Sequence, residues 1–99
     1  MADHDLIGYI KLIEEFLANN ISPLTFEHKY LEMFKKDETQ WLETEYEVLN
    51  GLFGDVDAFC ADDSLRDADD LNEQQLRESA GAALKALSSL QFQRSQTEP

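Results

Sequence analysis

The sequence predicts an all-α fold, a single-domain antiparallel four-helix bundle with an acidic loop between the third and fourth helices. Four segments repeat apolar residues at spacings of three and four, which is the period of one helical face. Mostly short connections join these segments, so consecutive helices are expected to lie side by side in opposite directions. The chain has 99 residues, and we expect residues 1–90 to form one domain and residues 91–99 a flexible C-terminal tail.

The first helix is expected at about residues 5–19. Asp3 or Asp5 is a candidate for its N-cap, and Asn19 followed by Asn20 is typical of a left-handed stop. Its apolar face consists of Leu6, Tyr9, Ile10, Ile13, Phe16 and Leu17.

The second helix is expected at about residues 23–36. Ser22 followed by Pro23 is typical of an N-cap with proline at the first helical position, where a missing N–H costs nothing. Lys35 and Lys36 suit the negative end of the helix dipole. The inner face is expected to hold Leu24, Phe26, Tyr30, Met33 and Phe34.

The third helix is expected to open at Asp37 or Thr39 and to end near Gly51 and Gly54. Its mostly apolar stripe consists of Trp41, Leu42, Glu45, Val48, Leu49, Leu52 and Phe53. The opposite face carries Glu38, Glu43 and Glu47. This segment contains no cation that could pair with them, so we expect the acidic face to point outward toward a partner.

Carboxylates are most concentrated in residues 54–78, where nine of them face only two cations. Residues 1–36 carry a net charge of −2, residues 37–78 carry −12 and residues 79–99 carry +1. Within this stretch, residues 61–70 are rich in turn formers and predict an irregular surface loop. The residues expected to hold this part of the chain to the core are Val56, Phe59, Cys60, Leu65 and Leu71.

The fourth helix is expected from Asn72 to about Leu90. Asn72 and Gln75 resemble a capping box, in which each side chain satisfies a backbone N–H of the other residue. The inward residues are expected to be Leu76, Ala80, Ala83, Leu84, Leu87 and Leu90.

The net charge of −13 exceeds the magnitude of about 2–8 that keeps a small domain soluble. Nucleic acids and anionic membranes are themselves negative, so this charge opposes binding to them and favours a basic protein partner. The sequence has no apolar run long enough to cross a membrane and no secretion signal at its N-terminus. Its one cysteine, Cys60, cannot form an internal disulfide, which is consistent with the cytoplasmic location that we expect.

A calcium loop is the first metal site to test, with Asp55 in its first position. The match fails, because Phe59 and Cys60 occupy the fifth and sixth positions and Arg66 replaces the glutamate of the twelfth. No phosphate-binding, zinc or nucleophile motif is present either. We therefore expect no enzyme activity, no cofactor and no metal.

The remaining candidates are residues that could bind a partner. Trp41 is either a core residue or an anchor at an interface, since tryptophan is enriched among binding hot spots. Arg66 either braces the acidic loop, for example by pairing with Asp57, or contacts a partner directly. Exposed carboxylates within a Debye length of one another reinforce a common field, which accelerates encounter with a cationic surface.

Almost the whole chain resembles the family of bacterial immunity proteins similar to the colicin D immunity protein, which also includes contact-dependent inhibition immunity proteins. The resemblance runs from LIGYIKLIEEFL through ISPLTFEHKYLEMF to LFGDVDAFCADDSLRDADDLNEQQLR. Its most specific part is the run from Asp55 to Cys60, followed by Leu65-Arg66-Asp67 and Leu76-Arg77.

The resemblance implies a small helical bundle that binds and neutralises the C-terminal nuclease domain of a cognate toxin, in particular a tRNase. Its carboxylates would stand in for tRNA phosphates over the basic active site, in a complex of one monomer with one toxin domain. The residues expected to bind the toxin are Trp41, Glu43, Glu47, Asp55, Asp57, Asp62, Asp63, Arg66, Asp67, Asp69 and Asp70. The alternative is an acidic nucleic-acid mimic that regulates a DNA- or RNA-binding protein, because it would use the same acidic face.

Overall fold

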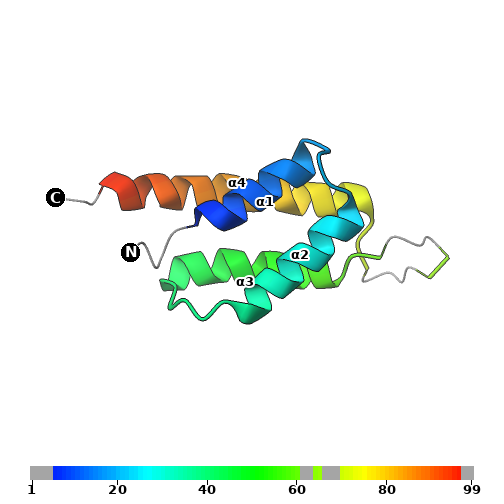
Figure 1. The fold of residues 1–99 in the computed structure, drawn as a ribbon, viewed down its shortest axis with the longest axis horizontal. Helices are drawn as coiled ribbons and strands as arrows, with labels where there is room; N and C mark the ends of the chain where they lie inside the picture. The colour runs from blue at the N-terminus through cyan, green and yellow to red at the C-terminus, as the bar shows by residue number, and fades with distance from the viewer. Residues whose placement is uncertain (1–5, 61–63, 66–69, 97–99) are drawn as a thin grey trace.

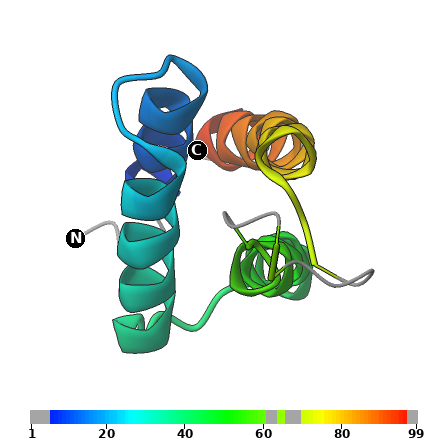
Figure 2. The ribbon, with the colours of Figure 1, turned by 90° about the vertical axis from the view of Figure 1, so that its right-hand side faces the viewer.

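The computed structural model of the chain describes residues 6–60, 64–65 and 70–96, with side chains as far as Phe92. It contains four α-helices, α1 (Ile7–Leu17), α2 (Pro23–Lys36), α3 (Glu43–Asp57) and α4 (Glu73–Gln96), so the prediction of an all-α helical bundle is confirmed (Figure 1). Each helix contacts the next one along the chain, and α1 also contacts α4. Figure 2 looks along α3 and α4 and shows α2 lying across their direction.

Side chains from all four helices meet in one hydrophobic core. Phe16 of α1 stacks on Phe26 of α2, with ring centroids 4.4 Å apart. Tyr30 is fully buried and donates a hydrogen bond of 2.8 Å to the backbone oxygen of Leu49, which joins α2 to α3. The buried hydrophobic residues of the described chain are Leu6, Tyr9, Leu12, Ile13, Phe16, Phe26, Tyr30, Leu49, Leu52, Val56, Phe59, Leu76, Ala80, Ala83 and Leu87.

The apolar periodicity identified most inward positions correctly but overestimated the width of each inner face. Leu24, Leu42 and Leu65 are 58%, 62% and 70% exposed, so the prediction that they contribute to the core is wrong. Leu12, which the prediction omitted, is buried. The cause is that periodicity gives the spacing of a helical face, whereas the neighbouring helices decide how much of that face they cover.

Three of the local signals for helix ends agree with the structure. Ser22 Oγ accepts a hydrogen bond of 3.1 Å from the backbone N–H of Thr25, and Asn19 has a φ of 65° after α1. Asn72 and Gln75 exchange their expected bonds, at 2.8 and 2.9 Å. The expected N-cap residues Asp3 and Asp5 lie outside the described residues, and Leu6 is the N-cap of α1.

The expected start of the third helix at Asp37 or Thr39 is wrong, because residues 37–42 form a non-helical connection. The Asp37 carboxylate holds this connection in place. It accepts hydrogen bonds from the hydroxyl of Tyr9 (2.6 Å), the backbone N–H of Thr39 (2.8 Å) and Nε1 of Trp41 (3.0 Å). The bond to Tyr9, 28 positions away, and the bonds to Thr39 and Trp41 hold residues 37–41 in a non-helical conformation, and α3 begins only at Glu43.

Two expected helix ends are also wrong. α3 continues through Gly51 and Gly54 to Asp57, because Leu52 and Val56 keep its inner face buried. α4 continues past Leu90 to Gln96, so residues 91–96 of the expected tail are helical. No glycine or proline interrupts this segment, and its glutamines and arginine favour a helix.

Candidate functional site

One face of α3 carries three exposed carboxylates. We call it the α3 acidic face, and it consists of Glu43, Glu47, Asn50, Gly54 and Asp57, all of which are exposed. A helix turns by 100° per residue, so these positions fall within an arc of about 80°. The rise of about 1.5 Å per residue spreads them over about 21 Å along the helix. α3 has five carboxylates and no Lys, Arg or His.

Asp55 and Asp57 were expected to act together, but they lie on different sides of α3. Two residues along a helix differ by about 200° in direction. Asp57 is exposed on the α3 acidic face, whereas Asp55 is half-buried on another side. Only Asp57 therefore shares a surface with Glu43 and Glu47.

Both aspartates occupy the last turn of α3, where the helix dipole is negative and no basic residue is present. A charge of the wrong sign at such a position costs about 0.3–1 kcal/mol when exposed. α2 shows the favourable arrangement, with Lys35 and Lys36 in its last turn. Interaction with the helix dipole therefore does not explain why the two aspartates stand at these positions of the free chain.

A second carboxylate from another helix lies beside Asp57. Burial raises the pKa of Glu27, on α2, above its ordinary value, and the nearby charge of Asp57 raises this pKa further. Two neighbouring carboxylates form a site at which a partner's cation would be stabilising. Sequence reasoning missed Glu27, because its proximity to a residue 30 positions away is purely tertiary.

Backbone hydrogen bonds join the residues on either side of the interval 61–70. Phe59 and Leu71 form an isolated parallel β-bridge, in which Cys60 N–H donates to Leu71 O and Leu71 N–H donates to Ala58 O, both at 2.9 Å. Phe59 is buried, which attaches this bridge to the core. Asp70 precedes the bridge by one residue and is half-buried. The other expected loop residues, Asp62, Asp63, Arg66, Asp67 and Asp69, lie outside the described residues.

Trp41 lies in the connection before α3 and not on the helix. Its indole N–H donates to Asp37, and its ring meets that of Tyr9 edge-on at a centroid distance of 6.1 Å. Partial burial alone would raise the pKa of Asp37, but hydrogen bonds from Thr39, Tyr9 and Trp41 outweigh it and hold this pKa below its ordinary value. Trp41 thus stabilises an ionised carboxylate within the chain.

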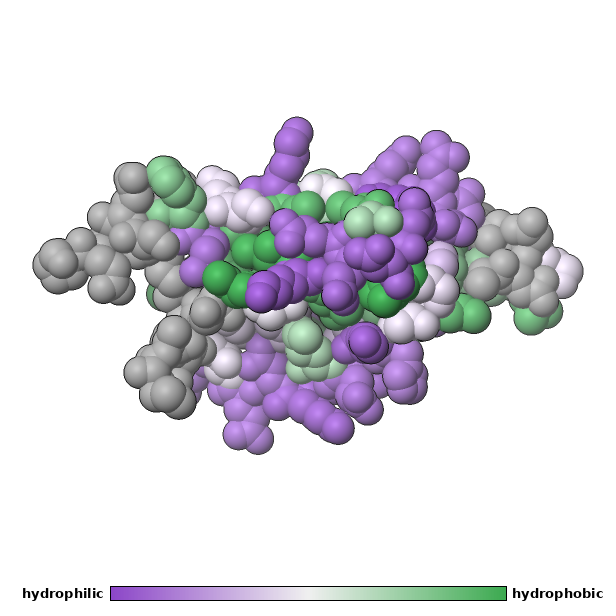
Figure 3. Space-filling model, turned by 45° about the horizontal axis from the view of Figure 1, so that its top comes forward, coloured by the Kyte–Doolittle hydropathy of each residue, from purple (hydrophilic) through white to green (hydrophobic). Residues whose placement is uncertain are grey.

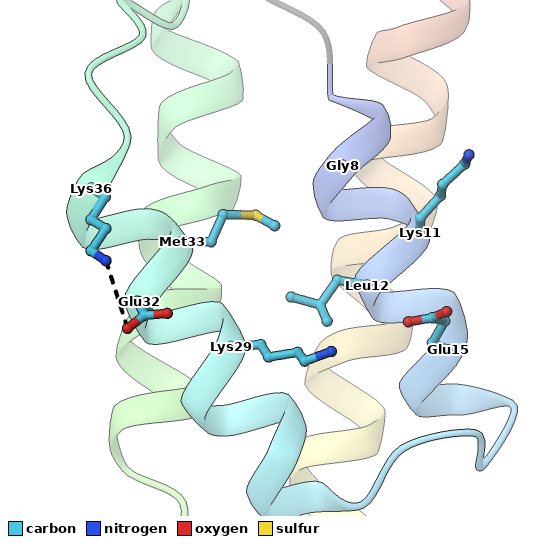
Figure 4. A pocket seen from close by; sticks show the side chains of 8 residues that line it. All are labelled: Gly8, Lys11, Leu12, Glu15, Lys29, Glu32, Met33 and Lys36. Atoms are coloured by element: carbon cyan, nitrogen blue, oxygen red, sulfur yellow. Dashed lines mark ion pairs between the residues drawn. The ribbon is translucent and has the colours of Figure 1, made fainter.

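The cations of the chain gather on a different surface. Figure 4 shows a groove between α1 and α2, with Leu12 and Met33 between the helices and Lys11, Lys29 and Lys36 around them. Lys36 pairs with Glu32 at 3.7 Å. Since Lys35 also lies on α2, half of the eight cations belong to α1 and α2, and none belongs to α3.

Two kinds of feature are absent from the part of the chain that the structure describes. No group of three metal-ligating side chains occurs there, and none of the helices combines the length and apolar character of a membrane span. On the face drawn in Figure 3, hydrophilic side chains cover much of the described surface, and hydrophobic atoms show between them as a band.

Comparison with known proteins gives one match. A family model described as bacterial self-protective colicin-like immunity matches residues 5–87. No match was found among curated proteins or among solved structures.

Proposed function

We propose that the chain neutralises the C-terminal nuclease domain of its cognate toxin, because it belongs to the family of bacterial self-protective colicin-like immunity proteins. The chain is an immunity protein, a toxin inhibitor and not an enzyme. In this proposal the toxin domain is a tRNase, and one copy of the chain binds one toxin domain. Protection of tRNA requires that the complex form in the cytoplasm.

The observation that carries this proposal is the negative charge of the α3 acidic face, on a helix that has no Lys, Arg or His. A nuclease that binds RNA needs a basic surface for the phosphates. The α3 acidic face offers carboxylates without a competing cation on the same helix, and Glu27 adds a carboxylate beside Asp57. In the proposed complex these carboxylates occupy the positions of RNA phosphates.

The loop between α3 and α4 extends this surface in the proposal. Asp62, Asp63, Asp67, Asp69 and Asp70 would meet the toxin beside Asp57, and Arg66 would shape the loop. The bridge between Phe59 and Leu71 supports this role, because it fixes where the loop leaves the bundle. The alternative of a regulatory nucleic-acid mimic uses the same carboxylates, but family membership favours a toxin.

The test uses the toxin domain encoded beside this chain, purified with and without it. We expect the chain to stop tRNA cleavage at a ratio of one to one and to rescue bacteria that express the domain. A chain that is folded but neither binds the domain nor protects the cells would overturn the proposal.

Matched charge variants test the role of α3. The double variant Glu43→Gln and Glu47→Gln should slow association about tenfold at low salt, because it removes part of the attracting field. The control, Glu14→Gln and Glu15→Gln, removes the same charge from exposed positions of α1. Equal slowing by both variants would show that net charge matters but the α3 acidic face does not.

A further inference from the structure

α3 exposes an aromatic ring beside its acidic face. Tyr46 is 49% exposed, although tyrosine is large enough to bury much apolar area, and Leu42 at the N-cap of the helix is 62% exposed. Leu42 directly precedes α3, and its backbone oxygen accepts a hydrogen bond of 2.8 Å from Tyr46 N–H. The bundle leaves much of both side chains uncovered.

The ring of Tyr46 packs on other aromatic rings on the side that faces the bundle. Its centroid lies 6.1 Å from that of Phe34 on α2. Phe34 in turn lies 5.1 Å from Phe53 and 6.3 Å from the fully buried Tyr30. No hydrogen bond involves the Tyr46 hydroxyl among the described residues. The ring is therefore supported on its inner side, while its outer side and its hydroxyl are available.

Carboxylates flank this ring. Glu43 lies one turn before Tyr46 on the same side of α3, Glu47 follows it directly, and Asn50 lies one turn after it. An exposed aromatic ring beside carboxylates matches a long cationic side chain, whose methylene stem packs on the ring while its charged end reaches a carboxylate.

We propose that Tyr46, together with Leu42, is the anchor of the toxin interface and receives an arginine or lysine side chain of the toxin domain. Tyrosine is enriched among binding hot spots, because it buries a large area at a low cost in side-chain entropy. A supported ring lowers that cost further. Tyr46 would thus anchor the interface beside Trp41, whose indole N–H donates to Asp37.

The negative charge of this face favours a basic protein as its partner over a second copy of the chain, a nucleic acid or an anionic membrane. A second copy of the chain would present the same cation-free α3, and equal charges would repel across a two-fold interface. Nucleic acids and anionic membranes are opposed for the same reason. A basic protein surface gains both the apolar contact and the ion pairs.

The inference rests on the proposed function for its partner, and the test separates the two. We expect Tyr46→Ala to weaken binding to the toxin domain by about 10- to 100-fold, mainly through faster dissociation, since hot-spot truncations cost this much. This loss should persist at 0.5 M salt, because it is apolar, whereas the loss from Glu43→Gln and Glu47→Gln should fade. Tyr46→Phe should bind within about threefold of the wild type, because the ring remains.

Two further variants distinguish a lost contact with the toxin domain from weaker binding that is caused by a less stable fold. Phe92→Ala removes an aromatic ring that is 62% exposed on α4, far along the chain from the proposed anchor, and should bind as the wild type does. Leu42→Ser introduces a favourable N-cap side chain, so it should raise the thermal midpoint and still weaken binding severalfold.

The outcomes are distinct. If Tyr46→Ala and Leu42→Ser bind as the wild type does while the glutamate variants bind more weakly, the anchor is wrong and the proposed function stands. If the folded wild-type chain does not bind the toxin domain, the proposed function fails and the anchor fails with it. Equal loss in Phe92→Ala would also overturn the anchor, because the effect would then not be specific to α3.

Discussion

Arg77 joins the start of α4 to the end of α1, and its removal offers the sharpest test of the fold. Its Nη1 donates 3.0 Å to the backbone oxygen of Phe16, and its Nη2 donates 2.6 Å to Oδ1 of Asn19. The guanidinium also lies 4.5 Å from the centroid of the Phe16 ring, and Nε pairs with Glu73 at 3.0 Å. The cation thus stabilises the negative end of α1.

The magnitude follows from these contacts. A hydrogen bond from a charged donor to a partly buried carbonyl is worth about 1.5–3 kcal/mol, and a cation over an aromatic ring adds about 0.5–1 kcal/mol at an exposed site. The ion pair with Glu73, whose side chain is 54% exposed, adds at most about 0.5 kcal/mol. Since a quarter of the Arg77 side chain is exposed, we take the lower part of the range and expect Arg77→Ala to cost about 2–3 kcal/mol.

Urea unfolding followed by circular dichroism measures this cost as a lower midpoint at an unchanged slope. A domain of this size should lose about 10–20 °C in its thermal midpoint. Arg77→Lys should recover less than half of the loss, because one ammonium cannot reproduce the planar fork. Glu73→Gln is the control and should cost less than about 0.5 kcal/mol. A loss below about 1 kcal/mol for Arg77→Ala, or an equal loss for Glu73→Gln, would refute the reasoning.

Three further changes test other parts of the structure. Asp37→Asn should lower the free energy of unfolding by about 1–2 kcal/mol near neutral pH. This cost should shrink in acid, because the pKa of Asp37 is lowered in the folded state. The stabilisation by the ionised carboxylate is complete above the unfolded pKa of about 4 and is lost as the pH falls through the folded pKa. Unfolding curves at several pH values would show this, and a gap independent of pH would contradict it. Tyr30→Phe should cost about 1 kcal/mol by removing the side-chain hydrogen bond that joins α2 to the backbone of α3, and a midpoint equal to that of the wild type would show that this bond adds no stability. Gly51→Ala and Gly54→Ala should each stabilise α3 by up to about 1 kcal/mol, since neither glycine has a positive φ and an added Cβ would meet nothing within 4 Å. Only Gly54→Ala should also weaken toxin binding, because Gly54 lies on the α3 acidic face, and equal binding by both variants would argue against close contact there.

Three signals between near neighbours were predicted correctly. The cap at Ser22, the left-handed Asn19 and the box of Asn72 and Gln75 each involve residues at most three positions apart, and all agree with the structure. The end of α3 at Gly51 and Gly54 was wrong, because burial of its inner face continues the helix. The start of α3 was also wrong, because Asp37 bonds to Tyr9 on another helix as well as to Thr39.

The candidate site likewise has features that local sequence patterns predict and features that depend on tertiary contacts. Its acidic character and the positions of Glu43 and Glu47 follow from charge and periodicity alone. The proximity of Glu27 to Asp57 depends on how α2 crosses α3, which no local pattern contains. The exposure of Tyr46 likewise depends on how far α2 covers α3. The remaining loop residues stay a prediction.

The bridge between Phe59 and Leu71 has a consequence for how this family can diversify. Two backbone hydrogen bonds and one buried ring fix both ends of residues 60–71, and none of these interactions depends on the side chains of residues 61–70. The donors and acceptors of the bridge are backbone atoms, so a change of side chain between its two ends leaves both hydrogen bonds available. The sequence of that interval can therefore change while the bridge that joins its ends is kept.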